Sequence, residues 1–175
     1  MNQQQYNRIP HFLRVLQQPP AAVAEISGSS DYPELSGTVQ LYRTDVGTLV
    51  TVQVFGLPVS ESACKKDVFA FHIHSGTSCT GNETDPFADA LTHYNPEDCE
   101  HPNHAGDLPP LWGNDGYAFE AFLTDRFSVQ EVVGKTVIVH RNFDDFTSQP
   151  AGNAGEKIAC GTIETYAAYR SMLKK

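Results

Sequence analysis

The sequence has few basic residues and no long apolar run, and each shortage excludes a class of protein. Its 175 residues include 12 lysines and arginines against 21 aspartates and glutamates, which gives a formal net charge of −9. So acidic a chain is a poor partner for nucleic acid or an anionic membrane, because both carry negative charge. None of its apolar runs approaches the length of a membrane-spanning helix. We therefore expect neither a nucleic-acid partner nor a membrane partner.

The first twenty residues lack the marks of a secretory signal. The segment MNQQQYNRIPHFLRVLQQPP has neither a basic start nor an uninterrupted apolar core. We therefore expect a cytoplasmic protein, or an exported protein whose signal has been removed.

The cysteines lack the C-x-x-C pairing of a structural zinc site. Their even number permits two disulfides, although a cytosolic setting would usually keep thiols reduced. Composition alone leaves the pairing open. The four cysteines are Cys64, Cys79, Cys99 and Cys160.

Short β-type segments separated by turn residues make up most of the chain. Within residues 21–57, Val50, Val52 and Val54 alternate with other side chains at a period of two, as in a strand. Further strands are expected at 68–74, 117–124, 135–140 and 157–163. Between them, residues 75–115 and 141–156 are rich in turn-forming residues and predict two long loops. The pattern indicates an all-β, antiparallel sandwich or barrel.

The two ends of the chain differ from this pattern. Apolar residues spaced i, i+3, i+4 and i+7 predict a short amphipathic helix at each end. At the N-terminal end these residues are Ile9, Phe12, Leu13 and Leu16. At the C-terminal end they are Tyr166, Tyr169, Met172 and Leu173. We expect the helices to cover the ends of the sheet rather than to form an oligomer or docking contact. Accordingly, we divide the chain into an N-terminal extension (1–20), a domain (21–165) and a C-terminal extension (166–175).

Six of the seven histidines lie within 69 residues, at spacings that a metal can use. His72 and His74 fall on an expected strand, where residues i and i+2 face the same side, so their imidazoles project together. His140 ends another expected strand and can complete the group. A single His-x-His pair would more often be a surface feature that binds nothing. Only His11 stands apart from the set.

A second group of candidate ligands lies in and just beyond the middle of the loop 75–115. It consists of His93, His101, His104 and Asp107. Three imidazoles and one carboxylate can build a closed tetrahedral zinc site. The alternative is a solvated polar loop, which explains neither three histidines within twelve residues nor the order of so long a loop. The number of ligands therefore favours a metal.

Five stretches follow the order of motifs typical of copper/zinc superoxide dismutases. They are FHIHSGTSC, THYNP, HPNHAGDLP, VIVHRNFDD and GNAGEKIACGTI, and they fall within residues 71–163. The alternating segments of 21–57 are consistent with the same fold. The resemblance implies a Greek-key, eight-stranded antiparallel β-barrel or sandwich of immunoglobulin-like build, with two long functional loops. A homodimer is one assembly that it allows.

The resemblance implies a copper site and a zinc site that share one ligand. The implied copper ligands are His72, His74, His140 and the shared His93. The implied zinc ligands are His93, His101, His104 and Asp107. Asp144 matches the carboxylate that accepts a hydrogen bond from one histidine of each site. Cys79 and Cys160 match the disulfide that ties the first long loop to the last strand.

The implied reaction is the dismutation of superoxide. Cu(II) takes an electron from one superoxide, which leaves as O₂, and Cu(I) returns it to a second, which takes up two protons and leaves as H₂O₂. In the family the bridging imidazole, here His93, is protonated when copper is reduced and later returns that proton. An alternative function is a catalytically weak module that binds zinc and has a structural or docking role. The complete set of copper-site histidines favours the enzyme.

Lys157 is one departure from the family, which usually has an arginine three residues before the last motif cysteine. Lysine keeps the charge that guides superoxide but lacks the planar fork of arginine, so we expect activity that survives but is lowered. The loop 141–156 is also short and lacks the lysine-bearing segment of many animal enzymes. Because only charges within about 8–10 Å act at physiological salt, we expect weak steering and a mild salt dependence.

Cys64 and Cys99 are extra relative to the family pattern. They can pair with each other, remain free, or place the Cys99 thiol near zinc, since Cys99 lies two residues before His101. A buried free cysteine is the ordinary alternative. Among these arrangements we expect a second disulfide.

Overall fold

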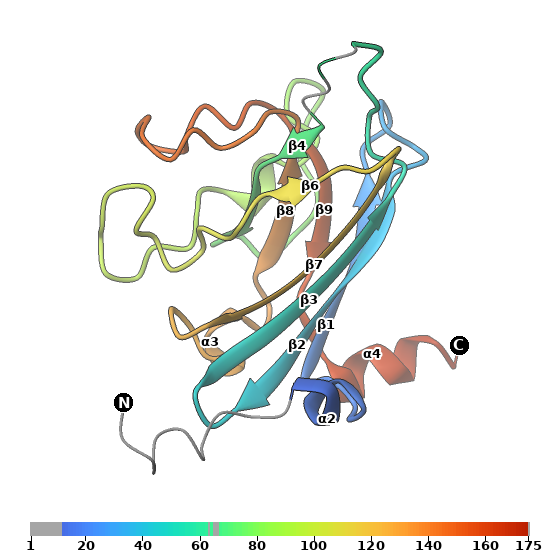
Figure 1. The fold of residues 1–175 in the computed structure, drawn as a ribbon, viewed down its shortest axis with the longest axis vertical. Helices are drawn as coiled ribbons and strands as arrows, with labels where there is room; N and C mark the ends of the chain where they lie inside the picture. Colours follow the sequence, from blue (N-terminus) through green and yellow to red (C-terminus); the bar gives the residue numbers. More distant parts are fainter. Residues whose placement is uncertain (1–11, 63, 65–66, 175) are drawn as a thin grey trace.

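Most of the described strands form one curled antiparallel sheet (Figure 1). The computed structural model describes residues 12–62, 64 and 67–174. Its strands are β1 (Ala22–Gly28), β2 (Ser36–Thr44), β3 (Gly47–Phe55), β4 (Val68–Phe69), β5 (Phe71–His74), β6 (Leu111–Trp112), β7 (Tyr117–Thr124), β8 (Thr136–His140), β9 (Lys157–Thr162) and β10 (Glu164–Thr165). Its helices are α2 (Phe12–Leu16), the 3₁₀ turn η1 (Ala88–Ala90), α3 (Val129–Val132) and α4 (Tyr166–Met172).

The main sheet has the strand order β5-β8-β9-β1-β2-β3-β7, with β10 added beside β1. Every pairing in it is antiparallel. The chain leaves β7 at one edge and returns as β8, next to the opposite edge, so the sheet curls into a half-barrel (Figure 1). A separate ribbon of β4 and β6 lies beside it. The all-β, antiparallel class predicted from the sequence is confirmed.

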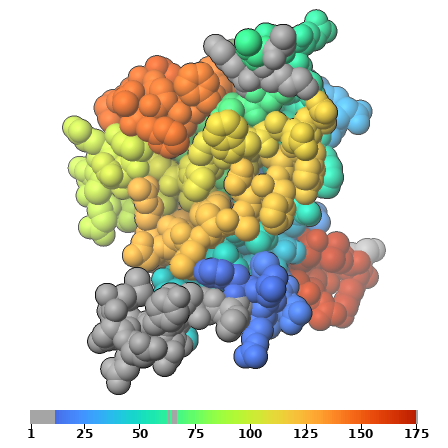
Figure 2. Space-filling view, viewed as in Figure 1, coloured from blue at the N-terminus to red at the C-terminus, as the bar shows by residue number. Residues whose placement is uncertain are grey.

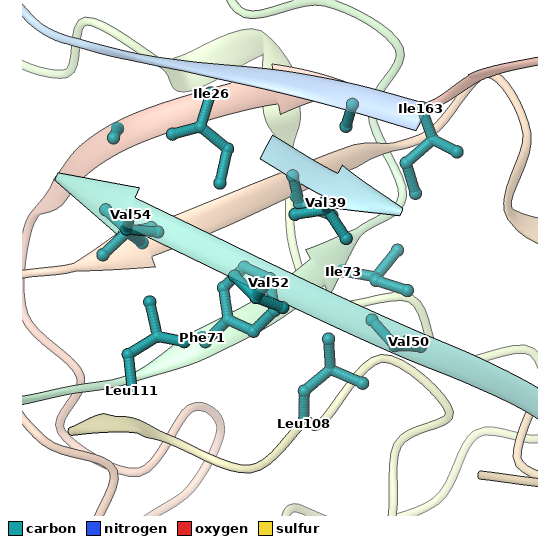
Figure 3. Close-up of a cluster of buried hydrophobic side chains, with 14 of the residues drawn as sticks. Ile26, Val39, Val50, Val52, Val54, Phe71, Ile73, Leu108, Leu111 and Ile163 are labelled. Carbon is teal, nitrogen blue, oxygen red and sulfur yellow. The ribbon is translucent and has the colours of Figure 1, made fainter. Parts of the chain in front are cut away.

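A continuous hydrophobic core fills the inside of the curled sheet (Figure 3). The alternating Val50, Val52 and Val54 of β3 all point into it, as their period of two predicts. Phe71 and Ile73 of β5 enter from the other half of the sheet. Full burial of such side chains contributes about 1.5–3 kcal/mol each. The core therefore fixes one face of β5, and that constraint decides where the alternating His72 and His74 point.

Several details of the secondary structure differ from the expectations. The expected strand 68–74 is divided into β4 and β5, which belong to two different sheets. The long loop 75–115 carries η1 and the short strand β6. Helix α3, in the connection between β7 and β8, was not expected, although its start has the capping-box pattern Ser-x-x-Glu. The Glu131 carboxylate accepts hydrogen bonds from the Ser128 backbone N–H at 2.7 Å and from its hydroxyl at 2.6 Å.

Helices form at both ends of the chain where the apolar spacing predicted them. Helix α2 lies against β2 and α4 against β1, at the same end of the sheet (Figure 1). Neither helix buries a residue completely. The Tyr169 hydroxyl donates to the Glu25 carboxylate at 2.9 Å, which ties α4 to β1. Ile9, part of the predicted N-terminal helix, lies outside the described residues, and the three-part division of the chain stays a prediction. None of the helices in the described segments has the length and apolarity needed to cross a membrane.

One disulfide links Cys79 to Cys160, with their Cα atoms 5.6 Å apart. It ties the first long loop to β9, and the expected pairing is confirmed. The expected second disulfide is wrong, because Cys64 and Cys99 are both free and exposed. They belong to different loops, one between β3 and β4 and the other between β5 and β6. Cys99 is held in its own turn, where its backbone N–H donates to the Asn95 side chain at 3.0 Å.

Removal of the Cys79–Cys160 disulfide is expected to destabilise the protein strongly. Its two cysteines are 81 residues apart, and closing a loop of that size in the unfolded chain corresponds to about 4.5 kcal/mol. Urea denaturation of metal-free Cys79→Ala/Cys160→Ala should therefore show a loss of that order. The matched control Cys64→Ala/Cys99→Ala should change the free energy of unfolding by less than about 0.5 kcal/mol. Equal losses in the two double variants would contradict this account.

Candidate metal centre

Four histidines meet on the face of β5 that points away from the core. His72 and His74 lie on β5, His140 ends the neighbouring β8, and His93 forms a β-bridge with His74 from the long loop. All four are buried, with 0% to 7% of their surface exposed. One ring nitrogen from each lies within 4.8 Å of those of the others. The strand periods predicted His72, His74 and His140 as one group, the family resemblance implied His93, and the structure brings all four together.

Hydrogen bonds to backbone carbonyls orient two of these rings. Nδ1 of His74 donates to the Leu91 carbonyl at 2.9 Å, and Nδ1 of His140 to the Gly155 carbonyl at 3.2 Å. The Nε2 atoms of His74 and His140 then face each other at 3.3 Å. Two neutral imidazoles that turn bare nitrogens toward one point form a typical half-site for a metal ion, because the outer hydrogen bond fixes the tautomer.

The second group, which consists of His93, His101, His104 and Asp107, lies directly beside the first. Its ligand atoms also lie within 4.8 Å of one another, and all four residues are buried. Nδ1 of each histidine approaches the Asp107 carboxylate, at 2.7 Å for His93, 3.1 Å for His101 and 3.2 Å for His104. Three imidazoles and one carboxylate around a single point are the ligand set of a closed zinc site. The sequence predicted all four of these residues.

His93 belongs to both groups. Its Nδ1 faces Asp107, whereas its Nε2 is buried and has no hydrogen-bond partner in the described structure. Nδ1 of His72 is likewise buried without a hydrogen-bond partner, and Nδ1 of His101, although 3.1 Å from an Asp107 oxygen, makes no hydrogen bond of acceptable geometry. Buried polar atoms are rarely left without a hydrogen bond, so these three nitrogens call for another kind of partner. Metal ions fit that need, because each unpaired nitrogen belongs to one of the two ligand groups.

Asp144 connects the two ligand groups through hydrogen bonds to one histidine of each. One of its carboxylate oxygens accepts from Nε2 of His72 and the other from Nε2 of His101, each at 2.9 Å. These bonds turn Nδ1 of both rings toward the ligand groups. Gly152 makes this position possible, since a Cβ there would lie 1.9 Å from an Asp144 oxygen and 2.8 Å from Nε2 of His101. The sequence indicated Asp144, but it provided no separate signal for Gly152.

The loop that carries the second group is held by two residues that sequence reasoning missed. Nη1 of Arg126 donates to the carbonyls of Pro102 at 3.0 Å and His104 at 3.1 Å. The Gln149 side chain pairs with the His101 backbone, donating to its carbonyl at 2.7 Å and accepting from its N–H at 3.1 Å. The two long loops therefore lie side by side on the surface, as the yellow-green and orange segments show (Figure 2). Hydrogen bonds of this kind, from a side chain to the carbonyl groups of a distant loop, cannot be recognised from a sequence motif.

A surface hollow of about 360 Å³ leads to the first group, and His140 is the histidine that lines it. Lys157 lines the same hollow, because it pairs with His140 in the β8–β9 register. Its ammonium forms an ion pair with Asp85. Glu83 and Glu156 also line the hollow, so its rim carries more negative than positive charge. The structure thus places Lys157 where the sequence predicted it, with a carboxylate partner that the sequence did not indicate.

The protonation states of His74, His140 and Asp107 suit the binding of a metal ion. Burial, together with the nearby His72, lowers the pKa of His140 to about 3, and burial also lowers the pKa of His74 well below its usual value. Burial raises the pKa of Asp107, but the His93 hydrogen bond and the surrounding imidazoles outweigh that effect and bring it to about 2. Metal ligands must be deprotonated, and His74, His140 and Asp107 already are at neutral pH.

The low pKa of His140 predicts that the metal-free protein loses stability in mild acid. Between about pH 3 and pH 6.5 the unfolded chain binds a proton at His140 that the folded chain does not, so the free energy of unfolding falls as the pH falls. The expected slope is about 1.4 kcal/mol per pH unit for this residue. Urea denaturation of His140→Asn between about pH 4.5 and 6 should show a slope smaller by that amount, whereas the control His11→Asn should keep the original slope. An unchanged slope in His140→Asn would mean that His140 is already charged in the folded state.

Comparison with known proteins agrees with the ligand geometry. The family model for copper/zinc superoxide dismutase (SODC) matches residues 35–163. Superoxide dismutase [Cu-Zn] 2 of Aquifex aeolicus is 32% identical over 145 residues, which cover 74% of this chain and 80% of that protein. Superoxide dismutase [Cu-Zn] of Escherichia coli is 33% identical over 142 residues, covering 73% and 78%.

A solved structure shows the same fold. The Cu/Zn superoxide dismutase from Brucella abortus superposes with a TM-score of 0.69 at 26% identity, and the match covers 82% of this chain and 99% of that one. The family model, the relatives and the two buried ligand groups agree, and the chain belongs to the copper/zinc superoxide dismutase family.

Proposed function

We propose that the protein dismutates superoxide to O₂ and H₂O₂ at a copper ion that shares His93 with a structural zinc ion. The observation that carries this proposal is the double membership of His93, whose Nδ1 lies in one ligand group while its buried Nε2 is left unpaired on the side of the other. A ring used in this way joins two metals at a fixed separation. The family to which the chain belongs supports the same assignment.

The two groups suit different metals. Four imidazoles without a carboxylate favour copper, and three imidazoles with Asp107 favour zinc in a closed tetrahedral site. Copper supplies the redox chemistry when bound, taking an electron from one superoxide and passing it to a second. The protein holds His72, His74 and His140 rigidly around that position, because strands β5 and β8 and their outer hydrogen bonds fix the rings.

His93 is the residue that we propose handles a proton. Its Nε2 faces the copper side and is the atom that would hold the proton and later deliver it to the departing peroxide. Its Nδ1 lies 2.7 Å from Asp107, within the group that would hold zinc, so zinc bound there would keep the ring in place when Nε2 changes partner. The zinc group therefore positions the proton carrier and takes no part in electron transfer.

Superoxide would reach the site through the hollow beside His140. Lys157, the one ammonium among the described residues lining this hollow, is the charge that would attract the anion. The surrounding Glu83, Asp85 and Glu156 oppose it. This balance supports the expectation of weak steering, and the lowered activity expected from lysine in place of arginine remains a prediction.

Reconstitution with both metals tests the proposed function. We expect one copper and one zinc per chain, with rapid dismutation measured by pulse radiolysis. His140→Ala should lose copper and almost all activity but retain zinc, whereas the control His11→Ala should retain both metals and full activity. Zinc uptake without activity after copper loading would refute the proposal and would instead favour the alternative of a zinc-binding module with a structural or docking role.

Asp144→Asn should weaken both metal sites at once. The amide cannot accept the hydrogen bonds of both His72 and His101 in the present geometry, so one ring in each ligand group loses its orientation. Loss of such a supporting carboxylate typically costs about 10- to 100-fold in metal affinity. Chelator competition should show that loss for zinc and for copper, while the exposed control Asp125→Asn should bind both normally. An effect confined to one metal would contradict a shared role for Asp144.

A further inference from the structure

Lys157 does not offer a free charge to an approaching anion. Its ammonium is paired with the Asp85 carboxylate, and 15% and 38% of the two side chains are exposed. Burial raises the pKa of Asp85, but the Lys157 hydrogen bond and the Phe87 backbone N–H together lower it below its usual value. The carboxylate is therefore ionised at neutral pH and cancels the nearest positive charge in the hollow.

The position of Asp85 is built into its loop. Its Oδ1 accepts from the Phe87 backbone N–H at 3.0 Å, which leaves Oδ2 for Lys157. The Asn82 side chain accepts from the Asp85 backbone N–H at 3.0 Å, and the Asn82 N–H donates to the Asp85 carbonyl at 2.9 Å. The Cys79–Cys160 disulfide joins the two segments that carry the pair. The hydrogen bonds of this turn therefore hold Asp85 in place against Lys157.

The other charged residues that line the hollow do not supply a positive charge in place of that of Lys157. Asp31, Glu83 and Glu156 add negative charge to its lining. The Tyr32 hydroxyl donates to Glu156 at 2.6 Å, and Arg141, which interacts with Tyr32, is not among the residues that line the hollow. An anion that approaches His140 therefore meets a rim whose single lining ammonium is already neutralised.

We propose that Asp85 is a positioning residue that fixes Lys157 and cancels its charge, and that it thereby limits the rate at which anions reach the copper side of the site. For superoxide the inference rests on the proposed function. For anion binding as such it rests only on the ion pair and on its place beside His140. In this protein, attraction of the substrate is restrained by a carboxylate that belongs to the hollow itself.

Asp85→Asn tests the inference, because the amide keeps the size of the side chain and can still accept from Phe87. The freed ammonium should raise the second-order rate of dismutation about threefold at low ionic strength, the effect of one unit charge roughly 6 Å away in water. The gain should shrink by about 0.3 M salt, where charges are screened within roughly 5 Å. Azide titration of the copper-loaded protein, followed by its charge-transfer absorption, should show a similar gain in affinity. Neither the salt response nor the azide affinity would move if Asp85 merely stabilised its loop.

Two matched variants isolate the role of the pair. Glu83→Gln removes the same charge from the same hollow but leaves Lys157 paired, so its gain should stay below about 1.5-fold. Asp85→Asn/Lys157→Met should return both readouts to the wild-type level or below. The inference is overturned if Asp85→Asn changes neither readout, if Glu83→Gln matches it, or if the double variant keeps the full gain. Higher azide affinity in a protein without dismutase activity would support the inference while refuting the proposed function.

Discussion

The whole metal centre depends on one buried carboxylate that accepts two hydrogen bonds. Asp144 binds a ring nitrogen of His72 with one oxygen and a ring nitrogen of His101 with the other, both at 2.9 Å. Each bond decides which nitrogen of its ring faces inward, so one side chain sets the tautomer expected in both ligand groups. The close approach of Gly152 and the bonds from Gln149 to His101 bring the second long loop to that position. The half-barrel is the rigid part of the structure, and Asp144 links the two long loops to it.

Strand β5 shows how the same short segment serves both the core and the site. Its sequence alternates between two apolar residues that enter the core and two histidines that face the loops, and all four are buried. The loop backbone continues the pattern, because His93 and Asp107 form bridges with His74 and His72. Packing energy on one face thus fixes ligand geometry on the other.

The histidine groups could be anticipated from strand period and ligand number, whereas Asp144 and the Cys79–Cys160 pairing could be anticipated only from the resemblance to the family. Interactions between distant segments could not. The Asp85–Lys157 pair joins residues 72 positions apart, and Arg126 acts through its bonds to loop carbonyls, so neither has a local pattern. The free Cys64 and Cys99 illustrate the same limit, since an even number of cysteines says nothing about which of them approach each other.

The wide distribution of the ligands along the chain has a thermodynamic consequence. The seven proposed ligands extend from His72 to His140 and come together only when β5, β8 and the first long loop are folded. An unfolded chain offers no comparable site, so each bound ion favours the folded state in proportion to the logarithm of its free concentration. The stability of the molecule is therefore not a constant of its sequence. It varies with the metal supply of its surroundings, and the protein is expected to be less stable where copper or zinc is scarce.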